Sequence, residues 1–435
     1  MSSNNKAANN KAANKNSNRR EFLKTSTLAG GALATSLTAA NPVHAQGSDI
    51  LKIGLIGCGG RGSGAAVNAM RAEDNLRLTA MAEAFPDRLE HSKNILSRQL
   101  GDKFQVDVDH SFVGFDAYKE LLATDIDVVL LCTPPHFRPA MFKEAIAQNK
   151  HVFCEKPVAT DAAGVRSVMD SVREAKDKNL NVVSGLCWRY DYGVRAIMEQ
   201  IQNGAIGDIR SIQENYLTGT LWHRGRKPEW SEMEYQMRNW LYFTWLGGDH
   251  IVEQHIHSLD KAMWLMGDEP PVRATGLGGR QERTDEKWGH VFDHFSVCYE
   301  WANGVKTHAY TRQMAGCSNN VEDFVVGTKG TARVLRNSYS INGEEKFRYK
   351  GPKPSMYDVE HKELFAAIRS GDTINNGDYM CKSTMLAIMG REVCYTGKTL
   401  TWEQMMNSKQ DMTPAYEWGD IAVPEVARPG KTPFV

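Results

Sequence analysis

The strongest constraint on the fold is a glycine turn that follows an apolar run. Leu51–Ile56 is typical of a buried strand, and Gly57-Cys58-Gly59-Gly60-Arg61-Gly62 follows at the spacing G-x-G-x-x-G, ahead of a helical pattern over 64–71. Glycine permits a tight turn and lets backbone N–H groups approach a phosphate at the start of a helix. The segment therefore predicts an α/β domain with a dinucleotide site.

Apolar runs and helical patterns alternate over the next part of the chain. Continuous Val, Ile and Leu runs between helices are typical of a parallel sheet covered on both faces. We expect strands at 76–83, 127–132, 151–154 and 181–186, and helices at 140–148 and 162–175. Residues 46–189 are therefore predicted to form a Rossmann domain with a doubly wound parallel sheet.

After about Tyr190 the pattern changes. Two alternating runs, 292–299 and 305–310, flank Asn303-Gly304, which is a strong signal for an antiparallel hairpin. Helical patterns follow or precede them at 251–266, 357–369 and 382–395. We expect 190–417 to be an α+β domain with a large, mainly antiparallel open sheet, and the Pro-rich 418–435 to be an arm on the body or on a neighbouring subunit.

The first 45 residues are typical of an export leader. A polar low-complexity stretch precedes Arg19-Arg20, which Phe22-Leu23-Lys24 and a weakly apolar run over 25–40 follow. Spanning a membrane takes about 20 strongly apolar residues, which this run does not supply. We expect a twin-arginine signal peptide that is cleaved near Ala45 after the export machinery has moved the folded protein to the periplasm.

Composition excludes some functions. Without residues 1–45 the formal net charge would be about −5, so no basic field remains to hold nucleic acid. The apolar fraction of 41% and the charged fraction of 24% are ordinary for a globular chain with a large core. The eight cysteines show no zinc spacing, and folding before export favours buried thiols over disulfides.

Glu83 ends the second expected strand. A carboxylate there accepts hydrogen bonds from ribose hydroxyls and repels a 2′-phosphate. Glu83 therefore favours NAD over NADP, although Arg88 weakens that preference.

Lys156 follows the strand expected at 151–154, within Glu155-Lys156-Pro157. Ligands of such sheets bind beyond the carboxyl ends of the strands, so Lys156 would project into the cofactor crevice and exchange a proton with a substrate hydroxyl. Position alone leaves this interpretation level with a surface lysine paired to Glu155.

These motifs together resemble the Gfo/Idh/MocA family, whose members include glucose-fructose oxidoreductase and inositol dehydrogenase. The resemblance lies in the glycine turn, Thr133-Pro134-Pro135, Glu155-Lys156-Pro157-Val158-Ala159-Thr160, and Gly247-Gly248 leading into His257-Ser258-Leu259-Asp260. It implies hydride transfer between a bound nicotinamide and a sugar or polyol carbon. It also implies that Thr133, Pro134, His136, Glu155 and Lys156 lie at the cofactor, and that the C-terminal sheet joins a homodimer or homotetramer.

The segment 247–260 supplies the remaining polar groups. If it is helical, His250, Glu253, His257 and Asp260 share one face. By the family pattern His257 is the base for the hydroxyl proton, Lys156 is its polarising partner, and Glu253 or Asp260 sets its tautomer. The family has Asp where this chain has the longer Glu253.

A metal site is the rival hypothesis for the same segment, because histidines and carboxylates crowd it. His255 and His257 would point to different sides of a helix, and no H-E-x-x-H spacing is present. We therefore expect no metal and take His255 as a core or surface residue.

Aromatic residues gather between 221 and 245. Aromatic faces stack on the C–H surfaces of sugar rings, while Arg, Asn and His bond to hydroxyls. The alternative is that these side chains form core or a subunit interface. The candidate substrate residues are Trp222, His223 and Trp240, together with Arg189, Tyr190 and His257.

The sequence thus predicts a periplasmic, NAD-dependent sugar or polyol oxidoreductase. An exported protein must carry its NAD through translocation and regenerate it in place, which favours a tightly held cofactor. Two alternatives remain: a redox-neutral, NAD-dependent glycoside hydrolase or lyase that oxidises its sugar transiently, and a non-catalytic sugar-binding protein.

Overall fold

The computed structural model describes residues 49–435, so the expected leader lies outside the described residues. Within the described range, no helix combines the length and the apolar character needed to cross a membrane. All eight cysteines belong to the described part of the chain and are free.

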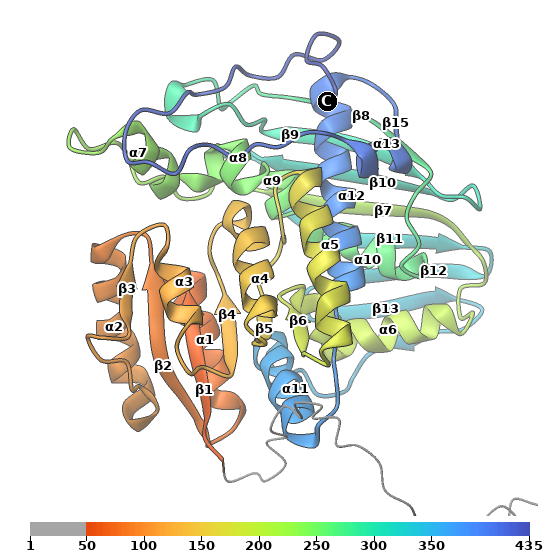
Figure 1. Ribbon diagram of the computed structural model, residues 1–435. Helices are drawn as coiled ribbons and strands as arrows, with labels where there is room; N and C mark the ends of the chain where they lie inside the picture. The colour runs from red at the N-terminus through yellow and green to blue at the C-terminus, as the bar shows by residue number, and fades with distance from the viewer. Residues whose placement is uncertain (1–48) are drawn as a thin grey trace, which may run out of the picture. The chain divides into compact units, whose positions relative to one another are not determined.

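The first sheet of the described chain has six parallel strands in the order β3-β2-β1-β4-β5-β6 (Figure 1). This is the Rossmann order, and it confirms the predicted fold of the N-terminal part. Because β1 lies between β2 and β4, the turn after β1 sits at the point where the order reverses. The strands are β1 (Leu51–Ile56), β2 (Leu76–Glu83), β3 (Ser111–Val113), β4 (Val128–Leu131), β5 (His151–Cys154) and β6 (Val182–Ser184).

Helices pack on this sheet, as the continuous apolar strands require. They are α1 (Gly60–Ala72), α2 (Pro86–Leu100), α3 (Ala117–Leu122), α4 (Arg138–Ala147), α5 (Ala162–Asp177) and, from far along the chain, α11 (Met356–Ser370). Helix α11 packs against α1 and β6, so the C-terminal half returns to cover the first domain (Figure 1). The prediction divided the chain near residue 190, so it placed α11 in the second domain, although α11 packs on the first.

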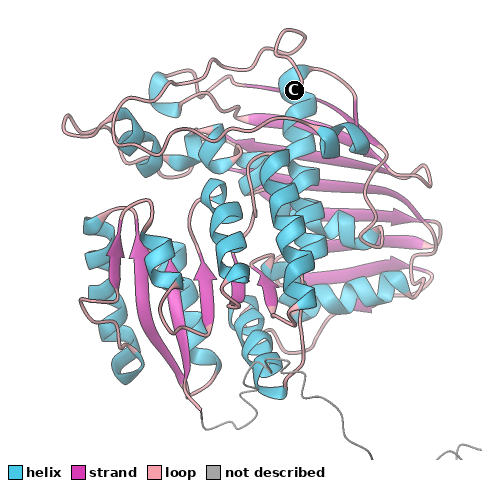
Figure 2. Cartoon of the chain, in the orientation of Figure 1, coloured by secondary structure: helices cyan, strands magenta, loops and turns pink. Residues whose placement is uncertain are grey.

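A second sheet of nine strands within residues 209–401 follows the order β14-β13-β12-β11-β7-β10-β9-β8-β15. All its neighbours are antiparallel except β7 and β10, which confirms the expected mainly antiparallel sheet (Figure 2). The hairpin predicted at Asn303-Gly304 joins β9 to β10. The strands are β7 (Ile209–Thr218), β8 (Arg273–Gly279), β9 (His294–Glu300), β10 (Lys306–Gln313), β11 (Asn320–Gly327), β12 (Gly330–Leu335), β13 (Ser338–Gly343), β14 (Phe347–Arg348) and β15 (Leu400–Thr401).

Helix α12 (Gly377–Thr396) joins the two halves, because it packs against α5 on one side and against β8 and α10 on the other (Figure 1). It is buried along nearly its whole length, including the charged Arg391 and Glu392. The remaining helices are α6 (Tyr192–Gln202), α7 (Glu232–Arg238), α8 (Thr244–Gly247), α9 (His250–Glu253), α10 (Ile256–Leu265) and α13 (Trp402–Asn407).

Candidate active site

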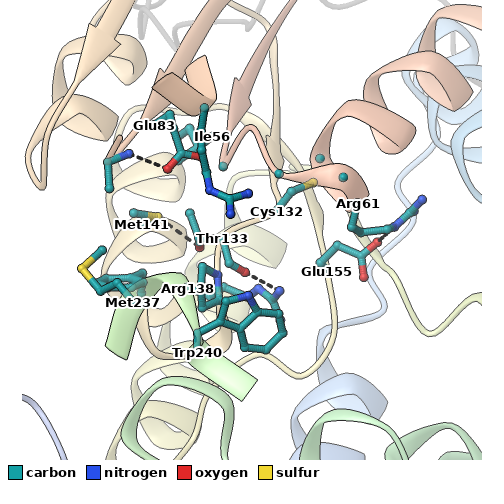
Figure 3. Close-up of a pocket in the computed structure, with 18 of the residues that line it drawn as sticks. Ile56, Arg61, Glu83, Cys132, Thr133, Arg138, Met141, Glu155, Met237 and Trp240 are labelled. Carbon is teal, nitrogen blue, oxygen red and sulfur yellow. Dashed lines mark hydrogen bonds and ion pairs between the residues drawn. The ribbon is translucent and has the colours of Figure 1, made fainter. Parts of the chain in front are cut away.

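A cavity of about 520 Å³ lies at the carboxyl ends of the parallel strands, between the two halves of the described chain. The first half contributes the glycine turn, Glu83, Thr133, Pro134, Glu155 and Lys156 to its lining. The second half contributes Tyr216, Trp222, Trp240, Glu253 and His257. Figure 3 shows Glu83, Arg61 with Glu155, and Trp240 around this space. Residues predicted from distant parts of the sequence therefore meet in one place.

The glycine turn fits a dinucleotide. Gly57 has φ +92°, and a Cβ at Gly62 would lie 1.9 Å from the Gly57 oxygen, so neither position tolerates a side chain. A Cβ at Gly59 or Gly60 would meet no atom within 4 Å, because these glycines face open space. Helix α1 starts there without a side-chain cap, which leaves its first N–H groups and the positive end of its dipole for a pyrophosphate.

Glu83 joins the end of β2 to the glycine turn. Its carboxylate accepts hydrogen bonds from the backbone nitrogens of Cys58 at 2.8 Å, Ala84 at 2.8 Å and Phe85 at 3.3 Å. Burial raises the pKa of Glu83, although these N–H groups and Arg88 oppose the shift. Oε1 accepts two of these bonds and Oε2 accepts one, so Oε2 keeps a further lone pair for a ribose hydroxyl.

Arg61 of the turn binds two carboxylates. Its guanidinium donates to Glu155 and, at 3.1 Å, to Glu360 of α11, and it lies over the ring of Tyr357 at 4.7 Å. The Glu155 carboxylate is therefore paired with Arg61. The alternative, in which Lys156 is a surface residue paired with Glu155, is wrong. Nothing in the sequence pointed to Glu360 or Tyr357, because they lie about 300 residues away from the turn that they support.

Lys156 is held by Glu253. Its Nζ donates to the main-chain oxygen of Glu253 and lies 3.0 Å from Oε1 of the same residue. Both side chains are almost buried, with exposed fractions of 11% and 12%. A paired ammonium group in this position can still reach a ligand in the cavity, which Lys156 also lines.

His257 faces the same cavity. Burial, with the nearby charge of Lys156, lowers its pKa well below the ordinary value, so the imidazole is neutral near pH 7 and can accept a proton. Its Nδ1 is buried and has no hydrogen-bond partner among the described residues. Neither carboxylate that was expected to set its tautomer does so, because Glu253 binds Lys156 and Gln254 instead.

The segment expected to be helical over 251–266 is helical, but it is not one continuous helix. It is divided into α9 and α10, and the N–H of His255 bonds to the carbonyl of His250, five residues back. The helical phase shifts at this wide turn, and the four polar side chains do not share one stripe. His250 bonds to Asp249, while only Glu253 and His257 of the four line the cavity.

Asp260, Arg189 and Tyr190 lie outside the cavity lining, contrary to their expected roles. The Asp260 carboxylate is buried and accepts from Arg189 at 2.9 Å and from Ser383 at 2.8 Å. Arg189 also binds Asp268, and Tyr190 donates to Asn376. These residues tie the end of the Rossmann sheet to α10 and α12, so their polar groups are already satisfied by the protein.

Of the remaining residues expected at the cofactor or the substrate, some line the cavity and others do not. Trp222 and Trp240 line the cavity, whereas His223 does not and lies 2.9 Å from the Lys287 carbonyl. His136 lies outside the lining and bonds to the Tyr416 hydroxyl at 2.9 Å. Burial lowers the pKa of His136 to about 4, so its imidazole is neutral near pH 7.

The C-terminal arm begins after α13, earlier than the expected residue 418, and packs on two residues that line this cavity. The ring of Tyr416 stacks on Phe115 with centroids 5.7 Å apart, and Trp418 packs on Phe85 and Phe115 at 5.4 and 4.6 Å. Both phenylalanines line the cavity beside Glu83. The arm also bonds to the second half, where the N–H of Met233 donates to the Gly419 carbonyl.

Sequence reasoning missed Tyr216 and Gln254. Tyr216 of β7 lines the cavity, and its hydroxyl lies 3.4 Å from Oε1 of Gln254. Gln254 stands next to Glu253 in the sequence, whereas Tyr216 lies in β7, which was not recognised. Within the described residues, no group of three or more His, Cys, Asp and Glu side chains is arranged to hold a metal ion.

Two relatives match most of this chain. An inositol 2-dehydrogenase of Burkholderia cenocepacia is 25% identical over 332 residues, which is 74% of this chain and 87% of the relative. A 2,7-anhydro-N-acetylneuraminate hydratase of Escherichia coli is 25% identical over 304 residues, covering 68% of this chain and 72% of the relative.

A solved structure shares the fold. Levoglucosan dehydrogenase, in complex with NADH and levoglucosan, superposes with a TM-score of 0.64 at 19% identity, covering 81% of this chain and 99% of that one.

Two family models match along the chain. Residues 51–183 match the model described as an oxidoreductase family with an NAD-binding Rossmann fold, and residues 194–333 match the model of the GFO/IDH/MocA C-terminal domain. Their order agrees with the two sheets and with the motifs at the cavity. The chain belongs to the GFO/IDH/MocA family of oxidoreductases, and its first domain is an NAD-binding Rossmann fold.

Proposed function

We propose that this protein is an NAD-dependent oxidoreductase that acts on a hydroxyl-bearing carbon of a sugar or polyol. The observation that carries the proposal is the meeting of Lys156 and neutral His257 in one cavity with the glycine turn. When bound, NAD supplies a hydride acceptor at the carboxyl ends of the strands. The chain's own residues supply proton transfer and orientation.

His257 takes the hydroxyl proton in this proposal, because burial keeps its imidazole neutral. Lys156 donates to the hydroxyl oxygen and stabilises the negative charge that develops there. Glu253 fixes the lysine through two contacts, one with its main-chain oxygen and one with its carboxylate. Trp222 and Trp240 offer aromatic faces to a sugar ring, and Tyr216 offers a hydroxyl.

Glu83 supports NAD rather than NADP as the cofactor. A 2′-phosphate would meet a buried carboxylate at the end of β2, whereas a ribose hydroxyl can donate to it. The guanidinium of Arg88, which lines the same cavity and interacts with Glu83, opposes this preference.

We further propose that the cofactor is tightly held and that the protein works in the periplasm. The arm supports retention, because Tyr416 and Trp418 pack on Phe85 and Phe115, which line the cavity beside Glu83. The leader supports export through the twin-arginine machinery, with cleavage near Ala45. Replacing Arg19-Arg20 with two lysines should leave the precursor in the cytoplasm, and secretion of that variant at the normal level would reject the export route.

The open face of the second sheet supports assembly into a homodimer or homotetramer. Leu277, Ser296 and Tyr310 form one row across β8, β9 and β10, and Leu277 and Tyr310 are 67% and 37% exposed. A row of this kind on a sheet face is suited to burial against a second copy.

A redox-neutral reaction is the second candidate. It is supported by the hydratase of Escherichia coli, which is as similar to this chain as the inositol dehydrogenase is. Transient oxidation by the same residues would acidify the neighbouring C–H and allow elimination, followed by return of the hydride.

One experiment separates these functions. Mature protein is denatured, and the released nucleotide is identified by mass spectrometry; about one NAD(H) per chain is expected. Intact holoenzyme is then incubated with a panel of polyols, free sugars and glycosides, and the molecular masses of the products are measured by mass spectrometry. A product lighter by two hydrogens supports the oxidoreductase, whereas hydration or cleavage without net oxidation supports the second candidate. Turnover that is unchanged in both Lys156→Ala and His257→Ala would reject the proposed residues.

A further inference from the structure

Asp249, immediately before α9, has a backbone conformation that non-glycine residues rarely adopt. Its φ is +72° and its ψ is +163°, a region that is essentially restricted to glycine. Gly248 before it also has positive φ, at +78°. A conformation of this kind persists only where surrounding contacts hold it in place.

The side chain of Asp249 supplies such contacts. Its Oδ1 accepts from the His250 backbone nitrogen at 2.6 Å and from the His250 ring Nδ1 at 3.0 Å. Its Oδ2 accepts from the Phe292 backbone nitrogen at 2.8 Å and from the Tyr395 hydroxyl at 2.5 Å. The carboxylate is fully buried, so each of these bonds is made without competing water.

Helix α12 also anchors this turn. Arg391 is fully buried and donates to the Gly248 carbonyl at 3.3 Å and to the Thr160 carbonyl at 2.7 Å. Tyr395, one helical turn further along α12, binds Asp249 itself. The turn is thus fixed to the helix that joins both halves of the molecule.

The turn determines where α9 starts. The main-chain oxygen of Asp249 accepts from the nitrogens of Val252 and Glu253, both at 3.0 Å. Glu253 in turn offers its main-chain oxygen and its carboxylate to Lys156. A shift of this short helix would therefore move both acceptors away from the lysine together.

We propose that Asp249 is a positioning residue for the reaction: its carboxylate holds the start of α9 so that Glu253 keeps Lys156 in place. This proposal depends on the proposed function in one respect, namely that Lys156 acts on the substrate. Glycine at 249 would accept the backbone conformation but would lose all four side-chain bonds, so conformation and anchoring can be tested separately.

The test compares Asp249→Gly and Asp249→Asn with Asp268→Gly. Asp268 is a suitable control because it also has positive φ, at +60°, and binds Arg189 outside the cavity. Hydrogen exchange of the Val252 and Glu253 amides is measured in each variant, with kcat and KM and the pH profile of kcat. We expect Asp249→Gly to exchange these amides at least about tenfold faster and to lose about 10²-fold in kcat, with little change in KM.

In the same series Asp249→Asn should lie between wild type and Asp249→Gly, because its amide oxygen keeps part of the acceptor set. Asp268→Gly should lower the melting temperature but keep the wild-type exchange and pH profile. Wild-type exchange at Val252 and Glu253 in Asp249→Gly overturns the proposal, as do equal kcat losses and unchanged pH profiles in both glycine variants. If wild type shows no NAD-dependent turnover, the proposed function fails, and the exchange measurement still decides the role of Asp249.

Discussion

The Nζ atom of Lys156 lies 3.0 Å from Oε1 of Glu253 and donates to the main-chain oxygen of the same residue. Lys156 follows the strand β5 of the Rossmann sheet, whereas Glu253 ends α9 of the second half. The candidate acid-base group is therefore held across the boundary between the halves, and its geometry depends on how they pack.

The first prediction concerns this pair. Lys156→Ala should lower kcat by about 10²–10⁴-fold, the usual contribution of a positioned proton donor. Glu253→Gln should lower it less, because the main-chain contact remains. Single-turnover reduction of the bound cofactor measures both, and Lys150→Ala, a lysine that bonds to the Thr124 and Ile126 carbonyls, is the control. Equal losses in the Lys156 and Lys150 variants would contradict the assignment.

The second prediction concerns acid stability. Burial lowers the pKa of His255 from 6.5 to about 3, so between these values the unfolded chain binds a proton that the folded chain does not. The stabilisation is therefore complete above about pH 6.5 and is lost as the pH falls toward 3, at about 1.4 kcal/mol per pH unit. His255→Leu should reduce the overall slope by that amount, because other buried histidines such as His136 and His361 keep their own contributions. Urea unfolding at pH 4, 5 and 6 measures the slope. His110→Leu, an exposed control, should keep it; a wild-type slope in His255→Leu would show that His255 does not titrate this way.

Much of the fold was predictable because buried parallel strands leave a plain signal. The expected strands at 76–83 and 151–154 agree with β2 and β5, whose apolar runs are covered on both faces. Strand β7 was missed because it carries Glu214 and Asn215 at buried positions, which hides its alternation.

The candidate site was predictable only in part. The glycine turn, Glu83, Lys156 and His257 follow from motifs and strand ends. The assignments of Asp260 and Arg189 failed because each residue satisfies the other, and their 71-residue separation carries no local signal. The same holds for Tyr416 and His136, which meet across 280 residues. The wide turn at Gln254–His255 is set by tertiary packing, so a continuous helical pattern could not disclose it.

The third prediction tests the structural role of Asp260. Asp260→Asn leaves the buried Arg189 guanidinium without one charged partner, which should lower the free energy of unfolding by about 3–5 kcal/mol. Asp268→Asn should cost less, because that side chain is 32% exposed. Urea titration measures both. A kcat loss in Asp260→Asn without a stability loss would return Asp260 to the catalytic group.

The fourth prediction concerns cofactor choice. Glu83→Gln keeps the acceptor oxygen but removes the negative charge, so the ratio of NADP to NAD affinity should rise by about tenfold or more. Adding Arg88→Ala should reverse part of that rise, because a nearby cation would then be missing. Fluorescence titration of nucleotide-free protein with NADH and with NADPH measures the ratio of the two affinities. An unchanged ratio in Glu83→Gln would mean that other groups exclude the 2′-phosphate.

The fifth prediction concerns retention of the cofactor by the arm. The three ring contacts that Tyr416 and Trp418 make with Phe85 and Phe115 are each worth about 0.5–1.5 kcal/mol, so Tyr416→Ala with Trp418→Ala should speed cofactor release by at least about tenfold. Tyr416→Phe keeps the ring but loses the bond to His136, and it should have a smaller effect. Val423→Ala, at a half-exposed arm position, is the control. To measure the rate of cofactor release, holoenzyme is diluted into a large excess of NAD-free buffer that contains a nucleotide-consuming enzyme. If the double variant releases its nucleotide as slowly as the Val423 control, the Rossmann domain alone retains the cofactor, and the arm serves only to pack the two halves together.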